Sequence, residues 1–339
     1  MTRMIAEAGA RQSPPASAGL PEAIDGETIH TNANWTDVTP RLSILVPTYK
    51  DSANQLLSML AACHYAESVE IIVYDDGSQD IALTNAVRES VDAFPGAACL
   101  ITAEHNKGRS AGRNRLQASS RAPWLVFLDA DMIPDDEGFI VRYLKCVQDD
   151  PAPRLVVGGF SMKLTPFSSK TDLHRAQSER SECIPAHIRS EEPGRYVFTS
   201  NVLAHRDIMN AVPFDPAFSG WGWEDVEWGI RVSRQYPVEH IDNTATHLGL
   251  DTAQDLLRKY EQSGANFWLA VERHPDVMEQ TPLYRMASMF SRLPGRSLIR
   301  EISRYVSRMP VWLMPRAIRL LALKTFRAAV YGGARHAGT

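Results

Sequence analysis

The sequence predicts an α/β protein: a mostly parallel sheet with flanking helices, followed by a C-terminal helical extension. Apolar runs of strand length alternate with helical patterns between residues 42 and 131, an order typical of parallel sheets. Hydrophobic residues make up 44% and charged residues 22% of the chain, which are ordinary values for a globular protein. From residue 296 onward, basic and apolar side chains recur with helical spacing, which predicts the extension.

The domain boundaries follow from shifts in composition. Residues 1–39 are rich in Ala, Pro, Ser, Glu and Thr and are expected to be a disordered lead-in. Residues 40–250 are expected to form the main domain, in two halves of 42–131 and 132–250. Residues 251–339 are expected to form the helical extension. A chain of 339 residues is long enough for this arrangement.

Individual elements are predicted from periodicity and turn residues. In the first half, strands are expected at 42–48, 69–74, 98–102 and 124–128, and helices near 56–60, at 81–93 and from about 110. In the second half, strands are expected at 155–160 and 196–204, and a helix at 226–232. The polar stretch 165–195 has no clear period and is expected to be a long functional loop, such as a substrate lid.

The cysteines and the N-terminus indicate a cytosolic protein. Cys63, Cys99, Cys146 and Cys183 lie far apart, without a C-x-x-C pair, which argues against zinc and disulfides and fits a reducing compartment. The sequence contains no basic-then-apolar signal segment and no apolar run of membrane-spanning length.

The pair Asp129 and Asp131 is the first candidate for a ligand-binding site. It follows the apolar run Trp124–Leu128, which reads as a strand buried on both faces, and such strands present ligand-binding residues at their carboxyl ends. Ala130 between them leaves room for a bulky ligand. Two carboxylates suit Mg²⁺ or Mn²⁺, with water and phosphate as further ligands. The alternative is a solvated turn.

Further polar groups follow the neighbouring strands. Pro47-Thr48 ends the first strand and Asp75-Asp76-Gly77-Ser78 ends the second. Asn106, Gly108 and Arg113 lie in the loop and helix before Asp129. Carboxylates at this edge can accept hydrogen bonds from a base or ribose. Taken singly, Pro47 and Gly77 could be plain turn residues, and Arg113 a surface charge.

The second group of candidate functional residues is the segment Gly220-Trp221-Gly222-Trp223-Glu224-Asp225. Glycines beside tryptophans favour a tight turn that presents indole faces, on which sugars stack. Trp228 is expected to lie in the core. A core position is also the alternative to a sugar-binding role for Trp221 and Trp223. Glu224 and Asp225 open a predicted helix, where acids also suit the helix dipole. An ionised Asp225 could take a proton from a hydroxyl.

Together, these motifs resemble family 2 glycosyltransferases of GT-A fold, over about residues 42–250. The resemblance implies that Pro47, Thr48, Asp75 or Asp76, and Arg113 hold a nucleotide base and ribose, with Asn106 and Gly108 in the same region. It implies a D-x-D motif in which Asp131, helped by Asp129, holds the cation on the diphosphate. The first half is then the nucleotide half and the second the acceptor half.

The second group resembles the G-W-G-x-E-D motif of galactosyltransferase-type and chondroitin-polymerase-type enzymes. That resemblance implies Asp225 as general base, Glu224 as a sugar ligand, and Gly220 to Trp223 as a substrate platform. His247 resembles the family's late metal-binding histidine, and imidazole suits Mn²⁺, although a lone histidine is more often structural. Asn201 matches a small polar position in the family and is assigned to the substrate.

The C-terminal segment is strongly basic. From Thr281 onward it holds ten arginines and one lysine against a single acid, Glu301, a formal charge of +10. Four arginines recur every four residues, while apolar residues fall on the other side of the same helix: Arg296, Arg300, Arg304 and Arg308 against Ile299, Ile302, Tyr305 and Val306. Basic amphipathic helices suit an anionic membrane surface. The alternative is a helical cap that packs on the main domain. Nucleic-acid binding is not expected, because no nucleic-acid motif accompanies the charge.

The sequence thus predicts an inverting, metal-dependent glycosyltransferase, transferring a hexose or N-acetylhexosamine from a UDP-linked donor. The expected acceptor is a glycan or lipid-linked glycan in bacterial cell-surface polysaccharide synthesis. The expected location is cytoplasmic, peripheral on the cytosolic face of the inner membrane. Two alternatives are a non-catalytic sugar-nucleotide or glycan-binding module and a nucleotidyltransferase. The first does not need a base, and the second gives no reason for the tryptophan-rich motif.

Overall fold

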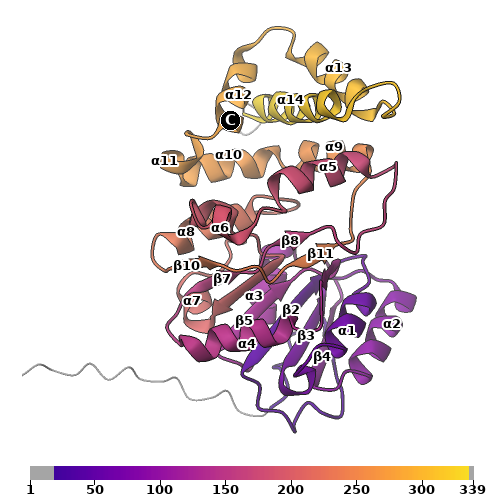
Figure 1. The fold of residues 1–339 in the computed structure, drawn as a ribbon, viewed down its shortest axis with the longest axis vertical. Coiled ribbons are helices and arrows are strands. Elements are labelled where there is room, and N and C mark those ends of the chain that lie inside the picture. Colours follow the sequence, from indigo (N-terminus) through magenta and orange to yellow (C-terminus); the bar gives the residue numbers. More distant parts are fainter. Residues whose placement is uncertain (1–18, 336–339) are drawn as a thin grey trace, which may run out of the picture.

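The computed structural model describes residues 19–335 and has an eight-stranded sheet as its centre (Figure 1). The strands lie in the order β1-β4-β3-β2-β5-β9-β7-β10. Their bounds are β1 Glu27–Thr31, β2 Leu42–Thr48, β3 Glu70–Asp75, β4 Ala97–Ala103, β5 Trp124–Leu128, β7 Leu155–Val157, β9 Asn201–His205 and β10 Val238–His240. Strands β4, β3, β2 and β5 are parallel, whereas β9 is antiparallel to both of its neighbours. The predicted mostly parallel α/β sheet is confirmed.

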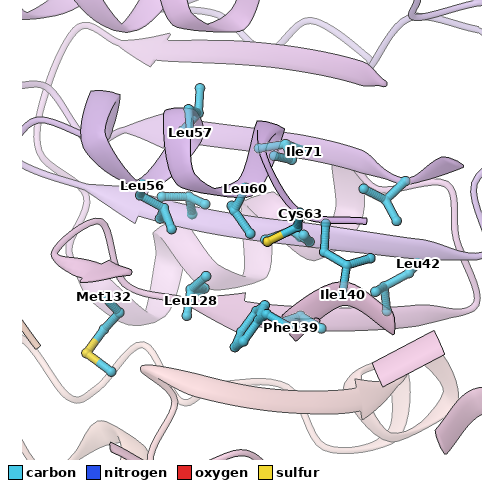
Figure 2. Packing of buried hydrophobic residues seen from close by; sticks show 14 of the residues in the cluster. Leu42, Leu56, Leu57, Leu60, Cys63, Ile71, Leu128, Met132, Phe139 and Ile140 are labelled. Atoms are coloured by element: carbon cyan, nitrogen blue, oxygen red, sulfur yellow. The ribbon is translucent and has the colours of Figure 1, made fainter. Parts of the chain in front are cut away.

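The sheet is buried on both faces, as the continuous apolar runs predict. On β2, Ile44 and Val46 face one core while Leu45 faces the other, because successive side chains of a strand alternate. Figure 2 shows the first core, where residues of one helix, including Leu56 and Leu60, pack over the sheet. Each fully buried aliphatic side chain contributes about 1.5–3 kcal/mol, so these strands anchor the site residues that follow them.

Helices of the main domain cover both faces of the sheet. The first core receives side chains from α1, α2 and α4, and the second from α3, α7 and α8. Their bounds are α1 Asn54–Ala61, α2 Ile81–Asp92, α3 Arg109–Ser119, α4 Phe139–Asp149, α7 Arg206–Ala211 and α8 Glu224–Ser233, with short 3₁₀ turns at η1 Ala66–Ser68 and η2 Pro193–Tyr196. Trp228 of α8 is fully buried and stacks on Phe214, which confirms its predicted place in the core.

A small second sheet brings distant residues to the end of β5. It consists of β6 Met132–Pro134, β11 Ala245–His247 and β8 Phe160–Ser161, in that order. In the antiparallel β6–β11 pair, His247 lies opposite Met132. This register places His247 beside Asp131, the residue that precedes β6.

The lead-in differs from its prediction in the part that the structure describes. Strand β1 pairs antiparallel with β4, and Trp35 is buried beneath the guanidinium of Arg121. Asn32 donates to the Phe94 and Gly96 carbonyls and accepts from the Ala98 N–H. The prediction of disorder is therefore wrong for residues 19–39, because the sheet edge supplies partners that composition does not reveal. Residues 1–18 lie outside the described part.

The stretch 165–195 is also more ordered than predicted. It contains α5 Asp172–Ser181, α6 Ala186–Arg189 and η2. Arg189 is fully buried and donates to four carbonyls, those of Val157, Gly158, Ile184 and Ile241, which fixes this segment to the sheet. The strand predicted at 196–204 begins only at Asn201.

The C-terminal extension stacks on one end of the main domain. In Figure 1, α5, α9 and α10 form a layer above the sheet, and α12, α13 and α14 lie beyond them. The bounds are α9 Ala253–Gln262, α10 Gly264–Arg273, α11 Pro275–Met278, α12 Pro282–Arg292, α13 Arg296–Arg308 and α14 Arg316–Ala334. Of the helices between residues 19 and 335, none combines the length and the hydropathy that crossing a membrane requires.

The apolar side of α14 is buried against the protein, whereas that of α13 is exposed. On α14, Leu320, Leu323 and Phe326 are buried against α5 and α9, as the cap alternative predicts. On α13, Leu298, Ile302 and Tyr305 are 66%, 54% and 67% exposed. The side of α13 that faces the protein instead carries Ser303 and Ser307, both buried. One helix of the extension is thus a cap, and the other turns its apolar row outward.

Candidate active site

The carboxyl edge of β2 and β3 gathers the residues predicted to hold the nucleotide. Thr48 and Asp75 are paired neighbours in the parallel ladder, and Pro47 precedes Thr48 on β2. The Asp75 carboxylate accepts from the Ser78 N–H and the Thr84 hydroxyl. A hollow of about 570 Å³, lined by Lys50, Ser78 and residues 79–83, opens beside this edge. The predicted neighbours are therefore together at one rim, beside open space.

Asp76 organises the loop that follows β4. Its two carboxylate oxygens accept the backbone N–H groups of Lys107 and Gly108, at 2.7 and 2.8 Å, and its carbonyl accepts from the Asn106 amide. Burial raises the pKa of Asp76 although these N–H groups favour its ionised form. Gly108 has φ +89°, a backbone conformation that glycine adopts without strain. Asp76, Asn106 and Gly108 thus shape this edge as one unit.

Arg113 connects the two carboxylate motifs. Its guanidinium donates to Asp129 at 3.0 Å and to Glu224 at 3.1 Å, and the residue is only 1% exposed. Asp129 also accepts from the Ser200 hydroxyl. Two protein carboxylates occupy the terminal nitrogens of Arg113, whereas its buried Nε has no hydrogen-bond partner among residues 19–335, and its contact with a nucleotide stays a prediction. Arg113 fixes the position of Asp129 relative to α8.

Asp131 and His247 face each other at the end of β5. Nε2 of His247 lies 3.1 Å from an Asp131 carboxylate oxygen. Burial opposes ionisation of Asp131, but the hydrogen bond and charge of His247 outweigh it and lower the carboxyl pKa. Burial likewise disfavours the imidazolium, yet Asp131 raises the pKa of His247. A Cβ at Gly249 would come within 1.9 Å of Asp131, so glycine there makes room for the pair.

The donor set of this pair fits a divalent cation. An imidazole and a carboxylate suit Mn²⁺, and such sites take their remaining ligands from phosphate and water. The Nδ1 atom of His247 is buried without a hydrogen-bond partner, so the ring is oriented by its bond to Asp131 and by packing against Phe160 and His174. Between residues 19 and 335, no three histidine, cysteine or acidic side chains form a ready-made metal cluster. Asp129 accepts one hydrogen bond on each oxygen, from Arg113 and from Ser200, and its help in holding the cation stays a prediction.

The Gly220–Trp223 turn has the tight geometry that its glycines predict. Gly220, Gly222 and Trp223 all have positive φ, at +74°, +85° and +77°. Such a conformation is costly for a side chain as large as that of Trp223. Asn266 of α10 donates to the carbonyls of Ser219 and Gly222 and thereby holds the turn. Strain at this place is maintained by the surrounding structure, which is common at functional sites.

Asp225 follows this turn at the start of α8 and is partly exposed. Burial and the charge of Glu224 raise the pKa of its carboxyl to about 6, against the opposing pull of Arg113. One of its oxygens accepts the N–H of Val226. Glu224 is 4% exposed and paired with Arg113 and Arg109, so its carboxylate is held within the protein. Asp225, the more accessible of the two, is the one available to an acceptor.

The two tryptophans of the turn contact the extension. Trp223 packs against Phe267 and donates its indole N–H to the Tyr331 hydroxyl at 3.2 Å. Trp221 lies beside Tyr260, at 6.2 Å between ring centroids. Both tryptophans are partly exposed. The substrate platform predicted for residues 220–223 therefore has α9, α10 and α14 as its backing.

Asn201 lies deeper than predicted. It is 1% exposed. Its amide accepts from the Tyr143 hydroxyl and donates to the carbonyls of Gly159 and Asn243. With these bonds made inside the protein, its side chain does not reach a substrate. The assignment to the substrate is wrong, and Asn201 instead joins β9 to the segments around β7 and β11.

Two charged residues of the site, Arg109 and Asp51, were not predicted from the sequence. Arg109, at the first position of α3, lies 3.5 Å from Glu224 with 45% of its side chain exposed. The carboxylates of Glu224, Asp129 and Asp225 raise its pKa in spite of desolvation. Desolvation and the charges of Asp131 and Asp129 raise the pKa of Asp51. A basic residue directly after Gly108 was the available signal for Arg109, whereas Asp51 lies in a polar loop without any pattern.

Comparison with known proteins agrees with this geometry. A family model described as Glycosyl transferase family 2 matches residues 43–180. This stretch of the chain is similar to the glycosyltransferase family 2. The matched region runs from β2 through β5 and the Asp129–Asp131 motif into α5. The predicted enzyme class, a glycosyltransferase, is confirmed at this level.

Relatives of this glycosyltransferase domain are remote. Validoxylamine A glucosyltransferase of Streptomyces hygroscopicus subsp. jinggangensis is 27% identical over 224 residues, covering 58% of this chain and 52% of the relative. Hyaluronan synthase of Pasteurella multocida is 25% identical over 313 residues, covering 76% of this chain and 31% of that protein. The chain thus spans about half the length, or less, of the curated relatives it matches.

A solved structure supports the fold of the chain. The mannosyltransferase from Pyrobaculum calidifontis, in complex with GDP-Man and Mn²⁺, superposes with a TM-score of 0.55 at 15% identity. The match covers 86% of this chain and 87% of that one. The predicted GT-A fold is therefore confirmed.

Proposed function

We propose that the protein is an inverting, metal-dependent glycosyltransferase that moves a sugar from a nucleotide-diphosphate donor to an acceptor hydroxyl. One observation carries this proposal. The pair Asp131–His247 and the partly exposed Asp225 belong to one site, which the bridge Asp129–Arg113–Glu224 joins. A cation-binding pair for a diphosphate and a base for a hydroxyl are the two parts that such a transfer requires.

Asp225 acts as general base in this proposal. It takes the proton of the acceptor hydroxyl while the hydroxyl oxygen forms a bond to C1 of the donor sugar. The bond from C1 to the diphosphate breaks in the same displacement, which inverts the configuration at C1, and the nucleoside diphosphate leaves with the bonding electrons. A Mn²⁺ or Mg²⁺ ion held by Asp131 and His247, when bound, supplies positive charge that stabilises the departing diphosphate. Inversion itself rests on the family resemblance.

The donor is proposed to be UDP-linked, with its nucleotide at the edge formed by Pro47, Thr48, Asp75 and Asp76. The transferred group is a hexose or N-acetylhexosamine. The matches to a glucosyltransferase and a hyaluronan synthase support sugar transfer. Arg109 is half exposed among the site carboxylates, and its cation is suited to a phosphate. The galactosyltransferase and chondroitin-polymerase subtype stays a prediction, resting on the turn at 220–225.

The acceptor is proposed to be a glycan or lipid-linked glycan used in bacterial cell-surface polysaccharide synthesis. The enzyme would work at the cytosolic face of the inner membrane, held there by its extension. The outward apolar row of α13, with Trp312 82% exposed in the next turn, supports contact with a lipid surface. A non-catalytic binding module would not need Asp225 with its raised pKa, and a nucleotidyltransferase would not need the tryptophan turn.

Two measurements test this function on the full chain. A thermal-shift screen of nucleotide sugars with and without Mn²⁺ should identify the donor, because a ligand that binds the folded state raises its stability. In the presence of that donor, slow release of the nucleoside diphosphate is expected from a transferase. Release of pyrophosphate would instead indicate a nucleotidyltransferase, and the absence of any hydrolysis or transfer would favour a binding module.

The variant Asp225→Asn tests the base. Asparagine keeps the size and much of the hydrogen bonding but cannot accept the proton, so turnover should fall by roughly 10²-fold or more. Donor binding in the thermal-shift screen should survive. Asp149→Asn, exposed at the end of α4, is the matched control and should keep full activity. Near-normal turnover of Asp225→Asn would remove Asp225 from the mechanism.

A further inference from the structure

Arg327 of α14 reaches the tryptophan turn from the extension. Its guanidinium carbon lies 4.9 Å from the ring centroid of Tyr260, 5.1 Å from that of Trp223 and 5.3 Å from that of Tyr331. Its Nε donates to the Tyr331 hydroxyl at 3.1 Å. The residue remains partly exposed. A cation enclosed by three rings is held in place, and the terminal nitrogens of its fork remain for another partner.

The charge of Arg327 has no acidic partner within the described residues 19–335. Three arginines of the extension do have one: Arg319 pairs with Asp172 at 2.7 Å, Arg300 pairs with Glu301 at 3.0 Å, and Arg304 pairs with Glu261. Within the same described part, Arg327 differs from the exposed unpaired arginines Arg292 and Arg308 in being partly buried among aromatic rings. A partly buried charge is costly without a direct partner. The three rings and the more distant charge of Asp225 favour the cation, but neither satisfies the terminal nitrogens of its fork. An unpaired guanidinium here therefore points to a ligand.

The surroundings of Arg327 show which ligand it would meet. Trp223, whose ring it covers, lies two residues before Asp225. Tyr260, also under its guanidinium, contacts Trp221. The ammonium of Lys259 lies 5.6 Å from the Trp221 ring centroid and is paired with Asp251 at 2.6 Å, so Arg327 is the cation left for a ligand. The donor diphosphate belongs to Asp131 and His247, at the end of β5. Arg327 and Lys259 instead flank the tryptophan turn, which is the acceptor side of the proposed site.

We propose that the acceptor carries an anionic group, a carboxylate or a phosphate, and that Arg327 binds this group while Asp225 receives the proton of the reacting hydroxyl. The inference rests on the proposed function and names the acceptor class. A guanidinium fork can donate two parallel hydrogen bonds to either anion. The rings around Arg327 set its direction, and the sugar that carries the anion would lie against Trp221 and Trp223.

Two sources could supply the anion, and simple probes separate them. Methyl β-D-glucuronide carries a carboxylate, glucose 1-phosphate carries a phosphate, and methyl β-D-glucoside carries neither. Their affinities for the full-length protein are measured by the fluorescence of its tryptophans. Because hydrogen bonds between charged groups are strong, at least one anionic probe should bind about tenfold or more tightly than the neutral one. The tighter of the two identifies the source.

Variants at position 327 test the residue. Arg327→Gln should abolish the preference for the anionic probe, while Arg327→Lys should keep part of it. Lys324→Gln removes a charge from an exposed position of the same helix and should change nothing. Arg327→Met, which preserves apolar contact with the rings, covers the case in which Arg327→Gln does not fold.

Two results would overturn the proposal: equal or undetectable binding of the charged and neutral probes to the unaltered protein, or a preference that survives in Arg327→Gln or Arg327→Met. Donor binding is measured in the same samples, so that failure of the whole site is distinguished from failure of this inference. A protein that binds donor normally but ignores the anion would refute only the acceptor class.

Discussion

Asp225 is a suitable base because its surroundings make proton uptake easier than for an ordinary aspartate. Burial and the neighbouring charge of Glu224 raise its pKa to about 6. At pH 7 most of the carboxylate is still ionised and can accept a proton. Its basicity is higher than that of a free aspartate, since the ideal base has a pKa near the working pH.

A pH profile tests this property. Protonated Asp225 cannot act as base, so kcat/KM should be level above pH 7 and fall as the pH drops through about 6, approaching about tenfold per pH unit. Glu224→Gln removes the charge that raises this pKa, so the acidic limb should move to lower pH. A limb that remains in place in Glu224→Gln would show that another group controls it.

Arg113 is a positioning residue that the sequence does not reveal as such. Arg113→Met would leave Asp129 and Glu224 without their shared partner, and breaking a buried ion pair in this way costs about 3–5 kcal/mol. The free energy of unfolding in urea should fall by that amount. Arg109→Met is the control, because Arg109 is half exposed and its contact with Glu224 is longer, at 3.5 Å. Equal losses in the two variants would contradict the bridging role.

At the scale of elements, the β6–β11 pair determines whether the cation site exists. It brings His247 to Asp131 across 116 positions of sequence, and the Leu248 N–H donates to the Asp131 carbonyl. Gly249 follows at once, where a Cβ would meet the Asp131 carboxylate. The motif Thr246-His247-Leu248-Gly249 therefore supplies both a proposed metal ligand, His247, and the space for the Asp131 carboxylate beside Gly249.

Gly249→Ala tests this element without touching either proposed ligand. The added methyl should push the Asp131 carboxylate away from His247, and Mn²⁺ affinity should fall by about 10–100-fold, as for other changes beside metal ligands. Electron paramagnetic resonance of titrated Mn²⁺ measures the affinity directly. Gly333→Ala, on α14, meets nothing closer than 3.4 Å and serves as control. Unchanged Mn²⁺ binding in Gly249→Ala would show that the cation binds at another place.

The elements also show what could be predicted from the sequence. Strands β2, β3 and β5 were predictable because each is a continuous apolar run with a turn after it. Strand β1, Glu27–Thr31, was not, because its polar sequence is stable only through pairing with β4. The same holds for the site. Asp131 and Asp225 could be predicted from motifs, whereas the burial of Arg113 and Asn201 depends on partners more than 50 residues away.

At the scale of the whole molecule, the extension packs into one folded unit with the sheet domain. Arg319 of α14 forms a buried ion pair with Asp172 of α5, and Tyr331 binds Trp223, Ser263 and Arg327 through its hydroxyl. Removing the extension would expose the cores that Leu323, Phe326 and Tyr331 fill. A test of membrane contact therefore needs point substitutions at the surface rather than truncation.

The outer face of the extension combines the two features of a peripheral membrane surface. Its apolar part consists of Leu298, Ile302, Tyr305 and Trp312, all more than half exposed. Exposed basic residues lie on α13 and on its neighbours α12 and α14, namely Arg308, Arg292, Arg316 and Lys324. Each basic residue near an anionic surface contributes about 1 kcal/mol. A second copy of the chain would present the same positive charge and be repelled, which favours anionic lipid as the partner.

The double variant Ile302→Ser and Trp312→Ser removes apolar area from this face without disturbing the core. Full-length protein should co-sediment with phosphatidylglycerol vesicles and much less with phosphatidylcholine vesicles, and the double variant should lose most of this binding. Salt at 1 M, where the Debye length is about 3 Å, should weaken it as well. Ile81→Ser, at an 80% exposed position of α2, is the matched control. Two results would show that this face does not contact the membrane. The unaltered protein could bind neither kind of vesicle, or the double variant could bind as well as Ile81→Ser.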